Sequence, residues 1–128
     1  MIIGLHESEF THEIKAPEAE KYNSSSCNRE KAQKHERQGS TIAYNPYGWS
    51  TVNGDIRNPR CGLAHELAHS EDADQGTLPS PEETVPGTSI RKSEVKAVNI
   101  ENKIRKKTGD VKRTKYAGQS FPTGVLDD

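Results

Sequence analysis

Hydrophobic residues with helical spacing lie near the middle of the chain. Leu63, Leu67 and Ala68 are spaced so that one face of a helix carries all three. Pro59 lies just before this stretch and is a natural boundary, because proline fits the first turn of a helix but not its interior. The pattern predicts a helix over residues 60–73 whose hydrophobic face packs on a core.

A second helix is predicted further along the chain. Ser89 or Ser93 is suited to cap its first turn, and Gly109 is a typical C-terminal stop. Glycine and proline residues recur within 76–87, so the segment between the two helices is predicted as a long loop. The side chains that share one side of the second helix, together with the stem of Glu101, are Ala97, Val98 and Ile104.

One short strand is predicted before the first helix. The segment Thr41–Pro46 contains β-branched and aromatic residues, follows Gly39 and ends at an Asn-Pro pair, which predicts a strand of about four residues. The next segment, residues 48–59, is rich in glycine, asparagine and proline and is predicted as a loop anchored by Trp49.

The two ends of the chain are more polar than its middle. Within residues 1–38 the hydrophobic residues are too sparse to specify more than one or two short, exposed helices or a partly disordered segment. The tail up to Asp128 is also short of hydrophobic residues. We therefore predict a polar N-terminal segment over residues 1–38 and one small domain of helices and strands over residues 39–128.

Composition limits the size of the core. Of the 128 residues, 30% are hydrophobic and 29% are charged, and the mean hydropathy is -0.96. These values suit a single domain with a small core. No stretch approaches the roughly 20 consecutive apolar residues of a membrane helix, and the first residues lack the pattern of a signal peptide. We expect neither a membrane segment nor a visible export signal.

Charge is distributed unevenly although the net charge is only -1. Residues 61–90 contain six acidic side chains and no lysine or arginine, whereas residues 91–116 contain ten lysines and arginines and three acidic side chains. The low net charge gives no general support for nucleic-acid binding. Two solvated faces are the simpler interpretation, and a basic surface over residues 91–116 that binds an acidic partner is the alternative.

The two cysteines do not form a metal-binding pattern. Cys27 and Cys61 are far apart and have no zinc-finger spacing. In a chain without an export signal, two cysteines are more often free thiols than a disulfide. Free thiols are therefore expected, with a disulfide as the alternative.

The predicted first helix contains the pattern His65-Glu66-Leu67-Ala68-His69, which has the form HExxH. Four residues on a helix bring His65 and His69 onto one face, about 6 Å apart along the axis, so that both imidazoles can bind one zinc ion. In this motif the carboxylate of Glu66 takes a proton from the attacking water and later delivers it to the leaving amine. The spacing predicts a catalytic zinc site.

A catalytic zinc normally has three protein ligands, so one more is needed. The longer pattern HExxHxxGxxH fails, because Asp72 and Gln75 occupy the positions of its glycine and third histidine. The second predicted helix offers Glu94 and Glu101, seven residues apart on nearly the same face, and Ala97 lets that helix approach closely. We predict Glu94 as the third ligand. Glu101 remains open as a hydrogen-bond partner of a ligand or as the alternative third ligand. Asp72 and Asp74 remain open in the same two roles.

Three segments in this order resemble the NleD-like bacterial effector metallopeptidases and related toxin domains of Rhs proteins. They are Gly62–His69, Glu94–Arg105 and Arg113–Tyr116, and the strand Thr41–Pro46 also looks like the one before the zinc helix there. The resemblance covers roughly residues 39–118. HExxH alone is generic, but the order of the three segments is more specific.

The resemblance implies an α+β zincin fold of the gluzincin type. A short sheet would pack on the HExxH helix, and an antiparallel second helix would carry the third ligand. The strand Thr41–Tyr44 would be the edge that pairs with an extended substrate. Arg113 and Tyr116 look like the RxxY pair of clostridial neurotoxin light chains, which flanks the zinc and stabilises the oxyanion.

These inferences lead to an expected function. We expect a zinc-dependent endopeptidase with Zn²⁺ on His65, His69 and Glu94, acting as a bacterial effector or toxin domain. A bacterial secretion system would deliver it into the cytoplasm of a target cell, where a monomer would cleave a protein. An immunity or inhibitor protein is an expected partner; nucleic acid and membrane are not. A binding module with a basic face, or a structural zinc with Asp72 or Glu101 as fourth ligand, is the alternative.

Overall fold

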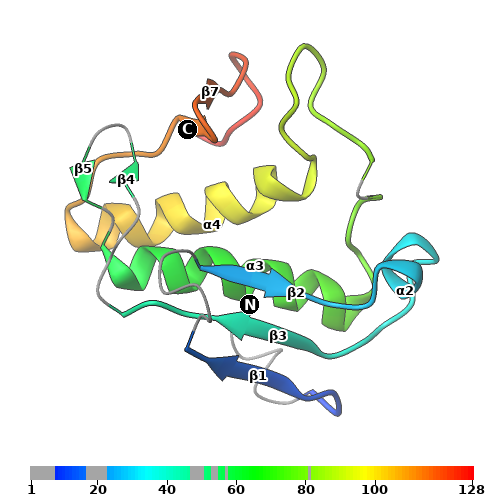
Figure 1. Ribbon diagram of the computed structural model, residues 1–128. Coiled ribbons are helices and arrows are strands. Elements are labelled where there is room, and N and C mark those ends of the chain that lie inside the picture. The colour runs from blue at the N-terminus through cyan, green and yellow to red at the C-terminus, as the bar shows by residue number, and fades with distance from the viewer. Residues whose placement is uncertain (1–7, 17–22, 47–50, 53–54, 57, 81) are drawn as a thin grey trace.

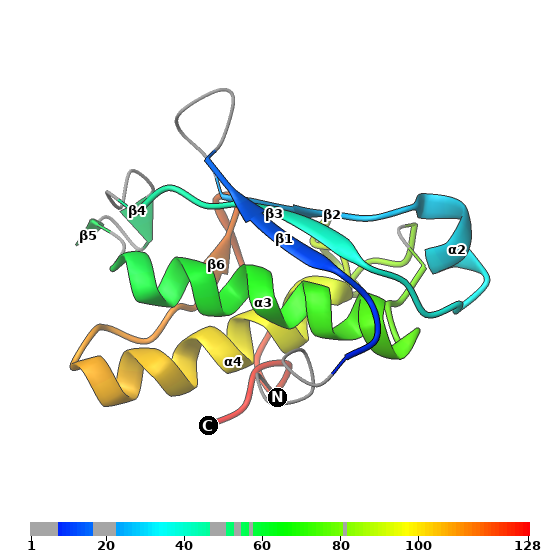
Figure 2. The same cartoon turned by 90° about the horizontal axis from the view of Figure 1, so that it is seen from below.

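The computed structural model describes residues 8–16, 23–46, 51–52, 55–56, 58–80 and 82–128. Helix α3 (Pro59–Gln75) lies in the middle, between a three-stranded sheet and helix α4 (Ser93–Thr108) (Figures 1 and 2). The two helices run antiparallel (Figure 1). The protein therefore has a small α+β fold in which a short sheet and a second helix pack on α3, as expected.

The sheet has the strand order β1-β3-β2. Strand β3 (Ser40–Ala43) pairs in parallel with β1 (His12–Lys15) and antiparallel with β2 (Ser24–Ser26). Ile42 of β3 is completely buried. The predicted strand is thus confirmed, but its prediction as the edge that meets substrate is wrong, because β1 and β2 occupy both of its edges.

Two of these three strands lie in the N-terminal segment, where the sequence pattern predicted only short helices. One short helix is present there, α2 (Arg29–Gln33), and the side chain of Asn28 accepts a hydrogen bond from Lys31 N in its first turn (3.0 Å). The strands were missed because their residues are polar and mostly exposed, without the alternation of a half-buried strand. The division of the chain at residue 38 stays a prediction.

A polar network fastens β1 to α3. His12 Nε2 lies 2.8 Å from Asp74 Oδ2, and His12 Nδ1 lies 2.7 Å from Ser40 Oγ. Ser8 also donates a hydrogen bond to Asp74, and Ser40 Oγ donates to Ser70 Oγ (2.7 Å). The carboxylate of Asp74 is almost fully buried. Hydrogen bonds, not hydrophobic contacts, therefore hold this edge of the sheet on the helix.

We expect the Asp74→Asn variant to be less stable than the wild type by about 1–3 kcal/mol near pH 7. Burial alone would raise the pKa of the Asp74 carboxyl, but hydrogen bonds from Ser8 and His12 hold it below its ordinary value. Because the Asp74 pKa is lower in the folded than in the unfolded protein, its ionised form stabilises the fold at pH values above the ordinary pKa of about 3.9. This contribution to stability disappears as the pH falls through the folded-state pKa. Urea denaturation should show the difference between the two proteins shrinking below about pH 4; a constant difference would contradict the role of the charge.

Helix α3 begins and ends where its local chemistry requires. The Asn58 side chain accepts a hydrogen bond from Arg60 N (3.0 Å), and Pro59 occupies the first turn. At the other end Gly76 has φ 70°, and a Cβ on it would lie 2.6 Å from the carbonyl oxygen of His35. Only glycine suits both conditions. The predicted helix over residues 60–73 is confirmed, with one more residue at its N-terminal end and two more at its C-terminal end.

The buried face of α3 matches the predicted one only at Ala68. Leu63 and Leu67 are only half-buried, whereas Ala64 and Ala68 are buried. The core is built largely from small side chains, and Ala97 of α4 is also 1% exposed. Small residues at this contact allow the two helices to approach closely. This close approach of α3 and α4 also brings polar side chains of the two helices into contact.

Helix α4 starts without the predicted serine cap. Its N-cap is Lys92, which is in helical conformation and whose side chain does not cap the helix. The first backbone N–H groups instead bond within a tight turn, from Glu94 N to Arg91 O (3.0 Å) and from Val95 N to Lys92 O (3.1 Å). The prediction of a cap at Ser89 or Ser93 is therefore wrong. The end at Gly109 (φ 76°) is confirmed, and of the predicted inner residues Ala97 and Val98 are buried while Ile104 is half-buried.

Two small hairpins complete the described fold. Strands β4 (Thr51–Val52) and β5 (Asp55–Ile56) form one, within the segment predicted as loop. Strands β6 (Lys115–Tyr116) and β7 (Gln119–Ser120) form the other, which the sequence pattern did not predict. Trp49, predicted as a loop anchor, lies outside the described residues.

The remaining predictions concern the long loop, the cysteines and the membrane. No helix occurs in the described residues of 76–87, as predicted. Cys27 is exposed and Cys61 is buried, and both are free thiols, as expected. Among the helices that the structure describes, none has the length and hydrophobicity needed to cross a membrane.

Candidate functional site

Three of the predicted site residues meet between the two long helices. His65 and His69 project from α3, and Glu94 projects from the first turn of α4. Glu94 Oε1 lies 2.8 Å from His65 Nε2 and 3.0 Å from His69 Nε2. One nitrogen or oxygen of each residue lies within 4.8 Å of the others, so the cluster could hold a metal ion.

Electrostatics favour a positive charge at this cluster. Burial opposes the charge of Glu94, but hydrogen bonds with His65 and His69 hold the pKa of its carboxyl well below the ordinary value. Burial would likewise lower the pKa of His65, but hydrogen bonds with Glu101 and Glu94 raise it. The Glu94 carboxylate is therefore ionised at neutral pH. Together with the two imidazoles beside it, this negative charge favours binding of a cation.

Glu101 occupies a different place from Glu94. It is completely buried, and its Oε1 lies 2.9 Å from His65 Nδ1, on the side of the ring away from the cluster. This contact orients the imidazole and leaves Nε2 for the cluster. Of the two glutamates that the sequence offered as third ligand, Glu94 is therefore the one whose carboxylate contacts the Nε2 atoms of both histidines.

Two arginines hold Glu101 in its buried position. Arg105 Nε donates to Glu101 Oε2 (2.8 Å), and Arg113 Nη1 donates to Glu101 Oε1 (2.9 Å). Sequence reasoning missed Arg105, although its spacing of four residues from Glu101 on one helix was a signal. The buried negative charge of Glu101 is thus compensated by Arg105 from its own helix and by Arg113 from the segment before β6.

Arg113 and Tyr116 lie beside the cluster. The Arg113 guanidinium is stacked 5.0 Å from the centre of the Tyr116 ring, and Arg113 Nε donates to Lys115 O (2.9 Å). The Tyr116 ring is nearly parallel to that of His65, with centres 6.0 Å apart. Burial, together with the negative charges of Glu94 and Glu66, raises the pKa of Tyr116 to about 12. At neutral pH the tyrosine therefore keeps its proton and can donate a hydrogen bond.

Of the other candidate residues, Glu66 adjoins the cluster in sequence, and the two aspartates pair with other residues. Glu66 is 6% exposed and follows His65 on α3. Asp72 pairs with Lys96, whose Nζ lies 2.7 Å from Asp72 Oδ1, and Asp74 belongs to the network with β1. Neither aspartate belongs to the cluster of His65, His69 and Glu94.

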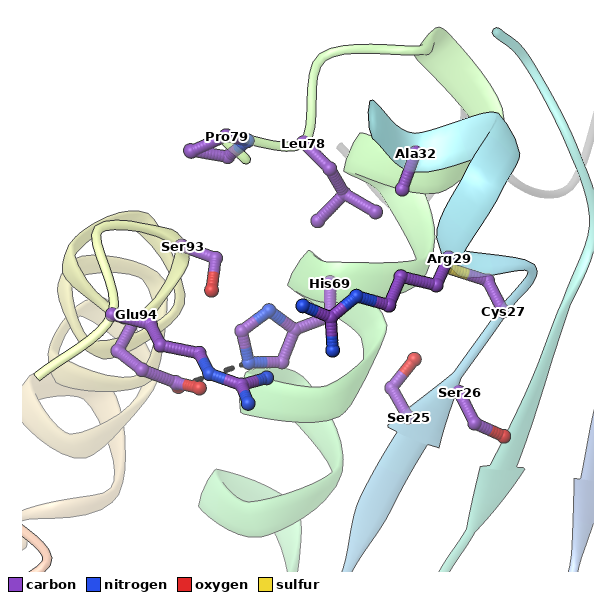
Figure 3. A pocket seen from close by; sticks show the side chains of 11 residues that line it. Ser25, Ser26, Cys27, Arg29, Ala32, His69, Leu78, Pro79, Ser93 and Glu94 are labelled. Carbon is purple, nitrogen blue, oxygen red and sulfur yellow. Dashed lines mark hydrogen bonds and ion pairs between the residues drawn. The ribbon is translucent and has the colours of Figure 1, made fainter. Parts of the chain in front are cut away.

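A pocket of about 240 Å³ opens beside His69 and Glu94 (Figure 3). Its walls come from β2, the start of α2, the loop after α3 and the start of α4. A second hollow, of about 190 Å³, borders Glu94 on the side of Tyr116. Arg91 and Glu94 line both. The cluster therefore lies between two recesses of the surface, as expected where an extended molecule passes over a site.

Comparison with known proteins places the chain in a family. No curated protein and no solved structure matches it. The family model of Peptidase_M91, described as "Effector protein", matches residues 3–120, and this match includes the N-terminal strands as well as the cluster. A peptidase acts on protein or peptide substrates, so a protein substrate is expected. The chain belongs to the Peptidase_M91 family of effector proteins.

Proposed function

We propose that this peptidase is a zinc-dependent endopeptidase of the gluzincin type. The observation that carries the proposal is the convergence of His65, His69 and Glu94 from two antiparallel helices, with Glu66 adjacent to the first ligand. Two imidazoles and one carboxylate are the ligand set of a catalytic zinc that keeps one position open.

The two donor-atom separations that involve Glu94 are also close to those of a zinc site. Zinc–ligand bonds of about 2.0–2.1 Å in a tetrahedral arrangement put the donor atoms roughly 3.3 Å apart. The 2.8 and 3.0 Å between Glu94 Oε1 and the two Nε2 atoms need only a small outward adjustment. A structural zinc would need a fourth protein ligand, but Glu101 is bound to Arg105 and Arg113, and Asp72 is bound to Lys96.

Each residue then has a chemical task. Bound zinc supplies Lewis acidity, which polarises the scissile carbonyl and makes water more acidic. Glu66 accepts a proton from the attacking water and returns it to the leaving amine. Glu101 keeps His65 oriented through the hydrogen bond at Nδ1 (2.9 Å).

Tyr116 is suited to stabilise the oxyanion that forms at the scissile carbonyl. It keeps its proton at neutral pH, since burial and nearby carboxylates raise its pKa to about 12. Arg113 is stacked on its ring and bonded to Glu101, so it supports both the tyrosine and the ligand orientation. A direct contact of Arg113 with the oxyanion is also part of the proposal.

Replacing Tyr116 with phenylalanine is expected to lower kcat by about 10²-fold, because the variant lacks a donor to the oxyanion. The phenylalanine ring keeps the stacking on His65, so zinc content and thermal stability should stay close to those of the wild type. Steady-state kinetics on a peptide substrate measure the change. A kcat equal to that of the wild type would show that the hydroxyl has no part in the reaction.

The free edge of β2 is the place proposed for the substrate backbone. Strand β2 pairs only with β3 in the described sheet, and residues Ser25, Ser26 and Cys27 line the pocket next to His69. An extended peptide that adds to this edge would pass the cluster. This edge replaces the Thr41–Tyr44 segment as the proposed substrate strand.

The biological setting is proposed from the family and from the resemblance to NleD-like and Rhs toxin peptidases. An effector protein acts in a cell other than the one that makes it, so a bacterial secretion system would deliver this peptidase into the target cytoplasm. There it would cleave a protein as a monomer, and an immunity protein would protect the producing cell.

The alternative, a module that binds through its basic face, has less support. Arg105 and Arg113 are buried and neutralised by Glu101, so they do not contribute to an exposed basic surface. Lys103, Lys106 and Lys107 remain exposed on α4. If binding were the function, reversing their charge would abolish partner binding while Glu66→Gln would not.

Zinc analysis tests the proposal directly. The purified chain is expected to contain one zinc per molecule and to cleave a protein or peptide substrate until a chelator removes the metal. The variant His69→Asn should lose the zinc, whereas His35→Asn should retain it. His35 is exposed and has φ 54°, a conformation that asparagine tolerates, so it is a matched control. Absence of zinc from the wild type, or full cleavage without it, would contradict the proposal.

A further inference from the structure

The pocket beside His69 has a chemistry of its own. Ala32, Leu78 and Pro79 give it an aliphatic wall, and Ser25, Ser26 and Ser93 add hydroxyl groups (Figure 3). At about 240 Å³ it has room for a side chain but not for a folded partner. It therefore resembles a recess for one residue of a bound peptide.

Two arginines make this recess positively charged. Arg29, from the start of α2, and Arg91, from the turn before α4, both line it. In Figure 3 the Arg29 side chain extends from α2 across the pocket toward the side of His69 and Glu94. Among the described residues that line the pocket, Glu94 alone is acidic, and its carboxylate contacts both histidines.

Among the residues that the structure describes, few accept hydrogen bonds from these two guanidinium groups. Arg29 contacts Glu82 through a single pair of atoms, Nη2 and Oε1 (3.2 Å), and both side chains are more than half exposed (60% and 73%), so this ion pair is weak. Within the part of the chain that the structure describes, the Arg91 side chain makes no hydrogen bond or ion pair. Most of their N–H groups are therefore available to a ligand.

We propose that this pocket, lined by Arg29 and Arg91, receives an anionic side chain of the substrate next to the bond that is cleaved. The inference rests on the proposed function, since it assigns a substrate class to the same site. A carboxylate or a phosphate satisfies the planar, forked N–H groups of arginine, and the aliphatic wall fits the stem of the side chain.

The position of the pocket relative to β2 supports this assignment. A peptide that pairs with the free edge of β2 has side chains that alternate between two faces. Residues of β2 and His69 line the same pocket, so a side chain that enters the pocket would belong to a residue close to the scissile bond. The two arginines thereby select the sequence at which cleavage occurs.

Peptide cleavage is the first test. In peptides that differ at one position, the wild type should prefer glutamate or aspartate over glutamine or asparagine by about 10- to 10²-fold in kcat/KM, as expected for hydrogen bonds to a charged group. A third peptide with phosphoserine at that position distinguishes phosphate from carboxylate. In the double variant Arg29→Gln/Arg91→Gln, the ratio of kcat/KM between the anionic and the neutral peptide should fall to about one.

A control variant makes the result specific to the pocket. Arg60→Gln removes an exposed arginine from the first turn of α3, outside the pocket, and should keep the preference for an anionic side chain. If the double variant also keeps it, or if the wild type shows no preference at any position, the proposal is overturned.

Cys27 gives a readout that does not depend on cleavage. It is exposed and lines the pocket, whereas Cys61 is buried. A negatively charged methanethiosulfonate should modify Cys27 faster than a positively charged one, relative to the rates in the urea-unfolded chain, and the double arginine variant should lose this difference. An unchanged ratio overturns the anionic pocket, whether or not peptides are cleaved. Failure to cleave any peptide, by contrast, contradicts the proposed function.

Discussion

Replacing Glu66 with glutamine is expected to lower kcat for peptide cleavage by about 10³–10⁴-fold while the zinc stays bound. Glutamine has nearly the same shape but cannot accept the proton of the attacking water or return it to the leaving amine. Because Glu66 follows His65 in α3 but is not among the residues of the metal cluster, its loss should leave zinc affinity nearly unchanged.

The measurement combines peptide kinetics with zinc analysis of the same preparation. Glu71→Gln is the matched control, because Glu71 lies further along the same helix and contacts Lys96 (3.4 Å) instead of the cluster. It should cleave at close to the wild-type rate. Cleavage by Glu66→Gln at the wild-type rate would disprove the assigned mechanism even if the zinc is present.

The second large effect is expected at Glu101. The variant Glu101→Gln should be less stable than the wild type by about 3–5 kcal/mol, because it leaves two buried arginines without a compensating charge. Arg105 and Arg113 are 4% and 8% exposed, and both lie within 2.9 Å of the Glu101 carboxylate. Zinc affinity should fall by about 10–100-fold, since His65 loses the carboxylate that orients it.

Denaturant unfolding and competition with a chelator measure the two effects separately. Glu83→Gln is the control for loss of a negative charge, since the Glu83 ion pair with Lys92 is about half exposed (52% and 50%) and contributes little. If Glu101→Gln matches this control in stability, the buried network does not stabilise the fold in the way described.

The site was predictable because its signals are local. The HExxH spacing puts His65 and His69 on one face of a helix, and this follows from helical geometry alone. The seven-residue spacing of Glu94 and Glu101 pointed to the two carboxylates that contact His65 in the structure. Which of them meets His65 Nε2 depends on how α4 lies along α3, and that is a tertiary property.

The sheet was less predictable because two of its three strands have few hydrophobic residues. Strands β1 and β2 contain mostly polar residues, and a buried network of Asp74, His12 and Ser40 holds β1 on α3. Periodicity detects strands by a hydrophobic face, so it detected only β3, whose Ile42 is buried. The error about the edge strand followed directly, since the partners of β3 were not foreseen.

The position of the ligands on two different helices has a consequence for the whole molecule. His65 and His69 belong to α3 and Glu94 to α4, so one cation held by these three residues would tie together two segments in a chain whose cysteines are unpaired. Any ligand that binds only the folded state shifts the folding equilibrium toward it. In a protein with an alanine-rich interior, the proposed zinc would therefore act as a removable cross-link. Cleavage and folding stability would then both depend on the supply of the metal.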